Sequence, residues 1–127
     1  ISSVDEKSND EISLMIKKTL KVLHWHGDRI ILPPQAKLLA SSARCNEQFF
    51  QIGDYIYGLQ FHVETEGLMT DDWIKNDKKF IISGLGINGQ KILKNQCNEF
   101  ELSTLNERVL FIRKLLDKII EYKKTSS

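Results

Sequence analysis

The alternation of apolar and polar positions divides the chain into a β-rich first half and a helical second half. Up to about residue 62, short runs of β-forming residues recur with Gly, Pro and Asp between them. We expect strands at residues 21–26, 29–32, 38–40, 47–52 and 55–62. Gly53 and Asp54 separate the last two runs, and glycine supplies the positive φ that a type II′ turn requires. The pattern therefore predicts a β-hairpin there.

After Glu64 the apolar residues follow a helical spacing. The pattern is compatible with short helices over residues 68–74 and 92–97, and residues 12–18 could form a short helix or a turn. The segment 84–89 matches the glycine pattern of a dinucleotide-binding loop, but no second strand and acidic residue follow in the required order. We therefore interpret it as a turn between helices.

The clearest predicted helix begins at Thr104. Thr104 and Glu107 have the spacing of a capping box, in which each side chain accepts a hydrogen bond from a free backbone amide. Apolar residues then recur on one face at Leu105, Val109, Ile112, Leu116, Ile119 and Ile120. We expect this face to pack against a core or a partner. Lys123 and Lys124 add favourable charge at the carboxyl end.

The composition excludes several classes of protein. The chain has 127 residues, enough for one domain or for part of a larger one. Eighteen Lys and Arg against 17 Asp and Glu give a net charge of +1, which excludes nucleic-acid binding by bulk charge. A hydrophobic content of 41% can form a packed core, yet no run approaches the twenty apolar residues of a membrane span. We expect no nucleic-acid or membrane partner.

The amino-terminal residues and the cysteines predict a cytoplasmic protein. Asp5 and Glu6 stand where a signal peptide would be basic and then apolar. Cys45 and Cys97 are too few for a disulfide scaffold, so a reducing cytoplasm is the expected setting. The chain starts with Ile1 rather than Met, so we expect either processing or a preceding segment.

The densest chemical pattern is His62-Val63-Glu64, at the end of an apolar run. In an extended backbone, positions 62 and 64 lie on the same side. A carboxylate there can accept the Nδ1 proton of the imidazole and leave Nε2 free to act as a base. Taken alone, the same residues fit a solvated strand end.

The surrounding residues resemble a known family. His24-Trp25-His26-Gly27-Asp28 is followed by Leu32-Pro33, Leu39-Ala40-Ser41-Ser42, Cys45-Asn46 and Gly58-Leu59-Gln60-Phe61-His62-Val63-Glu64. In this order and spacing, residues 20–77 resemble the second half of a class I glutamine amidotransferase domain. They are most similar to the stand-alone proteins related to the amidotransferase domain of GMP synthase. Val63 departs from the family pattern, which most often has Pro at this position.

The resemblance implies an α/β, flavodoxin-like fold, here incomplete, with residues 1–77 forming the carboxyl-terminal part of the amidotransferase domain and residues 78–127 a helical extension. It also implies glutamine hydrolysis to glutamate and ammonia by a Cys-His-Glu triad, with no cofactor and no metal. His62 would match the base and Glu64 the residue that orients it. His26, Gly27 and Asp28 would lie beside the bound glutamine.

The nucleophile of such a site is missing from the chain. The family's cysteine lies on a glycine-flanked turn well before the Trp25–Asp28 segment, whereas the first cysteine here is Cys45. Because members of a triad act together, we expect the chain alone to be inactive. The first parallel strands of the fold would also come from elsewhere, which would leave strand edges exposed. We therefore expect a partner, either the amino-terminal half or a second copy of the chain.

Two other interpretations use the same residues. His24, His26, His62 and Glu64 could ligate a metal, although residues 29–32 (Arg-Ile-Ile-Leu) provide no further ligand. Alternatively, the chain is a non-catalytic binding or interaction module derived from the amidotransferase fold, with its terminal helix docked on a partner.

Overall fold

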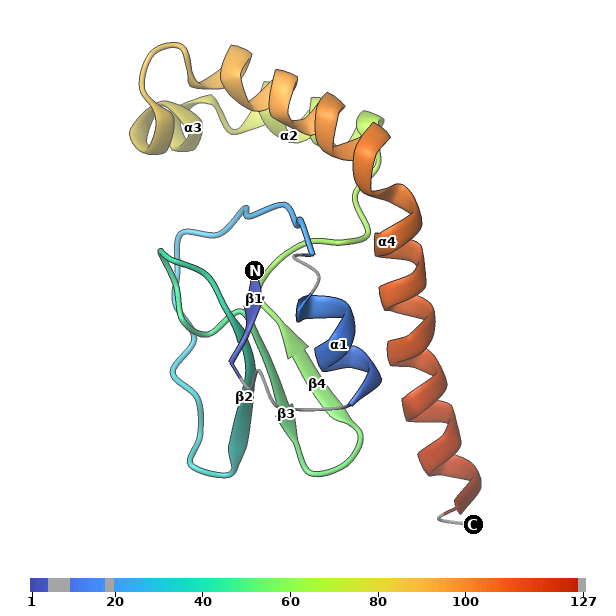
Figure 1. The fold of residues 1–127 in the computed structure, drawn as a ribbon. Coiled ribbons are helices and arrows are strands. Elements are labelled where there is room, and N and C mark those ends of the chain that lie inside the picture. The colour runs from blue at the N-terminus through green and yellow to red at the C-terminus, as the bar shows by residue number, and fades with distance from the viewer. Residues whose placement is uncertain (5–9, 18–19, 126–127) are drawn as a thin grey trace. The chain divides into compact units, whose positions relative to one another are not determined.

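The computed structural model describes residues 1–4, 10–17 and 20–125, which form two compact units. Unit 1 comprises Ile1–Val63 and Asn106–Ser127, and unit 2 comprises Glu64–Leu105. The elements are, in chain order, β1 (Ser2–Ser3), α1 (Glu11–Lys17), β2 (Ala36–Ser41), β3 (Phe49–Ile52), β4 (Ile56–Leu59), α2 (Gly67–Asn76), α3 (Lys78–Leu85) and α4 (Gly89–Thr125) (Figure 1). The chain is thus a mixed α/β protein.

Unit 1 contains a four-stranded antiparallel sheet in the order β1-β2-β3-β4 (Figure 1). The predicted hairpin is confirmed, and Gly53 has the expected positive φ of 61°. Its connection is longer than predicted, because Ile52 pairs with Ile56 and three residues lie between them. Among the described residues all named strands pair antiparallel, an arrangement compatible with an incomplete flavodoxin-like fold.

Two expected strands are absent from the described residues. Within 21–26, Leu23 makes a single isolated β-bridge, and residues 29–32 are irregular. Arg29 instead donates two hydrogen bonds to the Glu47 carboxylate, at 2.7 and 2.8 Å. Pro33 and Pro34 follow at once, and proline cannot donate to a ladder. The apolar run at 29–32 is therefore too short and too isolated to pair.

The core of unit 1 is aromatic. Phe49 of β3 and Phe111 of α4 are fully buried, with ring centroids 5.6 Å apart in an edge-to-face arrangement. Phe61 completes the group at 6.3 Å from Phe49 and 6.1 Å from Phe111. Ile12 and Ile16 of α1 join the same cluster. Of the two alternatives left open for residues 12–18, a short helix or a turn, the described part up to Lys17 forms the helix, and residue 18 lies outside the described residues. Burying each of these side chains contributes about 1.5–3 kcal/mol relative to exposure.

α4 corrects the prediction for the end of the chain. It runs without interruption from Gly89 to Thr125, so no helix begins at Thr104. Thr104 is buried, and its hydroxyl donates to the carbonyl of Phe100, four residues earlier, at 2.6 Å. That bond is typical of a threonine inside a helix rather than at its start. The capping-box interpretation was therefore wrong.

The expected apolar face of α4 packs on the core of unit 1 only in part, and its packing on a partner stays a prediction. Unit 1 buries Arg108, Phe111 and Leu115, with Ile112 and Ile119 partly buried at the margin. The other members of the predicted face are about half exposed: Leu105 52%, Val109 46%, Leu116 52% and Ile120 51%. The helix thus carries two apolar stripes, and the aromatic ring of Phe111 decides which one meets the sheet.

Unit 2 consists of α2, α3 and the first part of α4. The predicted helix at 68–74 is confirmed as α2, whose first amide, Gly67 N, donates to Glu101 Oε1 at 3.0 Å. The run Phe80–Ile82 belongs to α3, which ends at Gly86 with φ 79°. The segment 84–89 is therefore a turn between two helices, as interpreted, and no strand precedes it as a dinucleotide site would need.

The two compact units are divided at other positions than residue 77. The boundary expected after residue 77 concerns the extent of the amidotransferase domain, and it stays a prediction. None of the described helices has the length and apolar character needed to cross a bilayer.

Candidate functional site

The candidate base is held next to the first histidine-containing segment. His62 N donates to the Leu23 carbonyl at 2.9 Å, and Leu23 N donates to the His62 carbonyl at 3.1 Å. This pair of bonds is the closely spaced pattern of an antiparallel ladder. It brings residue 62 beside the start of the Trp25–Asp28 segment, although 39 residues separate the two positions along the chain. Two parts of the predicted site are therefore neighbours in unit 1.

The imidazole of His24 is affected by the charged groups around it. Burial lowers the pKa of His24, and the positive charges of the amino terminus, His26 and His62 lower it further. The rings of His24 and His26 lie with their centroids 5.9 Å apart. His24 is thus disposed to stay neutral when its neighbours become charged.

The expected substrate-contacting residues form a small exposed loop. His26 is half-buried, whereas Gly27 and Asp28 are exposed. Nδ1 of His26 lies 3.1 Å from the Asp28 carbonyl oxygen. A carbonyl oxygen only accepts, so this contact places the proton of the neutral imidazole on Nδ1 and leaves Nε2 as an acceptor. The loop can therefore present both a hydrogen-bond acceptor and a carboxylate to solvent.

Exposure alternates along the His62-Val63-Glu64 segment. Phe61, Val63 and Thr65 are buried, whereas His62 is half-buried and Glu64 is exposed. β4 itself ends at Leu59, earlier than predicted, and the backbone bends at Val63 and Glu64. Val63 ends the first stretch of unit 1 and Glu64 begins unit 2. The pairing of the imidazole with the carboxylate therefore stays a prediction.

Arg108 is a residue of this region that the sequence analysis missed. It is 2% exposed, and its Nη1 donates to the Val63 carbonyl at 2.8 Å. The two residues are 45 positions apart. In the sequence, Arg108 looked like one of several charged residues on a surface helix, and only its position one turn before Phe111 hinted at burial.

The two cysteines lie in different surroundings, and that of Cys97 is unlike that of an activated nucleophile. Cys45 lies in a turn in which Ser42 N donates to the Cys45 carbonyl at 2.9 Å. Cys97 is buried within a helix, and burial raises the pKa of its thiol despite a hydrogen bond with Thr70. A catalytic cysteine needs a lowered pKa. Among the described residues, no three His, Cys, Asp or Glu side chains are placed to hold a metal ion, so the metal interpretation gains no support.

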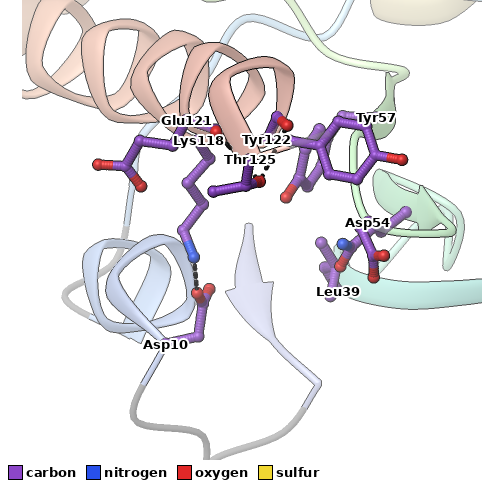
Figure 2. A pocket seen from close by; sticks show the side chains of 9 residues that line it. Asp10, Leu39, Asp54, Tyr57, Lys118, Glu121, Tyr122 and Thr125 are labelled. Carbon is purple, nitrogen blue, oxygen red and sulfur yellow. Dashed lines mark hydrogen bonds and ion pairs between the residues drawn. The ribbon is translucent and has the colours of Figure 1, made fainter. Parts of the chain in front are cut away.

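An open cleft of about 350 Å³ lies elsewhere in unit 1, at the hairpin end of the sheet (Figure 2). Its lining comprises Asp10, Leu39, Gln51, Asp54, Tyr57, Lys118, Glu121, Tyr122 and Thr125. Burial raises the pKa of the Tyr57 hydroxyl, and Lys118 and Asp10 form an ion pair across the cleft. None of the predicted site residues lines it, so the cleft and the His62 region are separate features.

Comparison with known proteins gives two partial matches. The chain is 47% identical over 45 residues to the glutamine amidotransferase-like protein YfeJ of Salmonella typhimurium, which covers 35% of this chain and 19% of that protein. It is 40% identical over 50 residues to gamma-glutamyl peptidase 3 of Arabidopsis thaliana, covering 39% and 20% respectively. The matched stretch thus spans about a fifth of each relative. No family model matches the chain. These partial relatives support a class I glutamine amidotransferase-like family.

Proposed function

We propose that this chain supplies the base and its orienting carboxylate to a glutaminase site of the class I amidotransferase type. His62 is the base, Glu64 fixes its orientation, and a cysteine outside this chain is the nucleophile. Glutamine is hydrolysed to glutamate and ammonia. His26, Gly27 and Asp28 lie along the bound glutamine, and the remainder of the site comes from the amino-terminal half or a second copy.

The observation that carries this proposal is the bridge between Leu23 and His62. It brings together two segments that the family resemblance independently assigns to one site. The alternating exposure from Phe61 to Thr65 also supports it, because side chains 62 and 64 are the more exposed ones. The two partial relatives favour the same family.

The proposed chemistry uses His62 twice. In the first step the imidazole accepts the proton of the thiol, and the thiolate attacks the side-chain carbonyl carbon of glutamine. The imidazolium then gives that proton to the departing nitrogen, so ammonia leaves and a thioester remains. In the second step His62 accepts a proton from water, and the hydroxide attacks the carbonyl carbon of the thioester. The carbon–sulfur bond breaks and the imidazolium returns its proton to the departing sulfur, which leaves glutamate and free thiol. A carboxylate on Nδ1 keeps the imidazole in the required tautomer and stabilises its charged form.

The two relatives suggest how broad the substrate class is. One is described as glutamine amidotransferase-like and the other as a gamma-glutamyl peptidase. Glutamine and a γ-glutamyl peptide share the same scissile γ-glutamyl amide, and they differ in whether ammonia or an amine departs. The proposed mechanism handles either leaving group, so both substrates belong in an assay.

A second candidate is a non-catalytic interaction module. The second apolar stripe on α4 favours it, because Val109, Leu116 and Ile120 are about half exposed in unit 1. A module of this kind would bind its partner without needing a cysteine.

The test is reconstitution. Release of ammonia from glutamine, and of amine from a γ-glutamyl dipeptide, is measured for the chain alone, for an amino-terminal half of a class I glutamine amidotransferase that carries the nucleophilic cysteine, and for the mixture. We expect turnover in the mixture alone. Turnover by the lone chain that survives Cys45→Ser and Cys97→Ser contradicts the proposed source of the nucleophile. A mixture that forms a stable complex yet hydrolyses neither substrate favours the interaction module.

A further inference from the structure

We propose that Arg108 is a positioning residue for the His62–Glu64 pair, acting through the backbone that joins them. The inference rests on the proposed function for its catalytic consequence. Its structural part, a guanidinium that fixes this backbone, can be tested in the chain alone.

Two separate anchors hold the segment. On one side, both peptide groups of His62 are bonded to Leu23. On the other side, Nη1 of Arg108 donates to the Val63 carbonyl at 2.8 Å. The carbonyl of Val63 and the amide of Glu64 belong to one planar peptide group. Fixing the carbonyl therefore fixes the peptide plane that leads to the Cα atom of Glu64, from which its side chain extends.

The type of side chain matters for this role. A guanidinium is charged at every accessible pH, so burying it is costly unless its donors are used. The carbonyl that Arg108 engages lies between the two proposed site residues, beyond the end of β4 at Leu59 and directly after the His62 bridge. A hydrogen bond from a charged donor is stronger than a neutral one, so it holds the backbone at this point.

α4 holds Arg108 rigidly in place. Phe111 follows three residues later on the same helical face and is fully buried against Phe49 and Phe61. The packing of Phe111 fixes the rotation of the helix, and that rotation directs Arg108 inward. The aromatic core and the anchor are thus coupled through one turn of helix.

The test compares Arg108→Met and Arg108→Lys with Arg113→Met, a change at an exposed position on the same helix. Two readouts in the lone chain need no turnover: the imidazole nitrogen signals of His62 by NMR, which report its tautomer, and hydrogen exchange of the Glu64 amide. We expect Arg108→Met to change the His62 signals and to speed Glu64 exchange by about tenfold. Arg108→Lys should retain part of the effect, and Arg113→Met should resemble the wild type.

In the reconstituted enzyme, Arg108→Met should lower kcat by about tenfold or more with little change in KM, because misplacement of a catalytic group affects the chemical step. A general loss of stability would move the urea midpoint and leave the His62 signals of the folded protein unchanged. The inference is overturned if Arg108→Met has the same His62 signals and the same rate of Glu64 amide exchange as the wild type. If Arg108→Met does not fold, the His62 signals and the Glu64 exchange rate of Arg108→Lys test the inference instead. If the wild-type mixture hydrolyses nothing, the proposed function fails while the NMR readouts still test the anchor.

Discussion

Gly58 faces the ring of Phe50 directly across the β3–β4 pair. The two residues are register partners, and a methyl group on Gly58 would overlap the ring, with Cε1 at 2.5 Å and Cε2 at 2.7 Å. Gly58 begins the Gly-Leu-Gln-Phe-His-Val-Glu stretch on which the family resemblance depends. Its role there is explained by packing, because the ring of Phe50 occupies the space that a side chain would need.

Gly58→Ala should therefore destabilise unit 1 by about 1–3 kcal/mol, the usual cost of forcing extra atoms into a packed site. The free energy of unfolding from urea titration measures it. Phe50→Leu in the Gly58→Ala background should recover part of the loss, because a smaller side chain makes room. Equal losses in the single and double variants would show that the ring is not the cause.

The two apolar stripes of α4 can be distinguished by truncation. Phe111→Ala should lower the free energy of unfolding by about 3–5 kcal/mol, since Phe111 is fully buried against Phe49 and Phe61. Leu116→Ala, on the second stripe at 52% exposure, should cost much less. Similar losses for the two variants in urea titrations would contradict the orientation of the helix.

The ion pair between Asp10 and Lys118 makes stability depend on pH. Burial tends to raise the pKa of Asp10, but hydrogen bonds from Lys118 and the Ser13 backbone outweigh it and lower the pKa overall. A lowered folded-state pKa stabilises the fold above the unfolded value of about 3.9. That contribution is lost as pH falls through the folded pKa. Asp10→Asn should thus destabilise by about 0.5–1 kcal/mol at pH 7, with the difference vanishing in acid.

The matched control for this prediction is Glu11→Gln. Glu11 is more exposed than Asp10, and it pairs with Lys114 at 3.1 Å. Thermal melts of both variants between pH 2 and 7 should show the larger pH-dependent difference for Asp10→Asn. A larger effect at Glu11 would assign the pH dependence to general surface charge instead.

The proposed base makes a prediction for the reconstituted enzyme. His62→Ala should lower kcat/KM for glutamine by about 10²–10⁴-fold, the range typical of a lost general base. Glu64→Gln should cost less, because it removes an orienting group and leaves the imidazole. His24→Ala serves as the control, since the proposed mechanism gives that imidazole no role. Full activity in His62→Ala would remove His62 from the mechanism.

The pattern of the chain predicted the hairpin and allowed for α1 because both depend on local features. Gly53 adopts the positive φ that its type allows, and Ile12 and Ile16 share one helical face. The resemblance also led to His62 and to the Trp25–Asp28 segment before any contact between them was known. What joins them, the Leu23 bridge, is a pairing between positions 39 residues apart that no local pattern encodes.

α4 shows why other predictions were wrong. Thr104 and Glu107 have the letters of a helix start, but Thr104 is buried and bonded to Phe100, so tertiary packing overrides the capping signal. Leu116 and Phe111 are both apolar, and periodicity alone cannot tell which of two stripes meets the sheet. Arg108 was missed for the same reason, because its burial follows from the rotation that Phe111 imposes.

The Leu23 bridge also bears on how a divided catalytic centre could be reassembled. Because the backbone of His62 is hydrogen-bonded to Leu23, just before the Trp25–Asp28 segment, these two parts of the proposed site belong to one preassembled half. A complementary half would then need to bind at only one interface, and the residues that this half contributes would be placed at the same time.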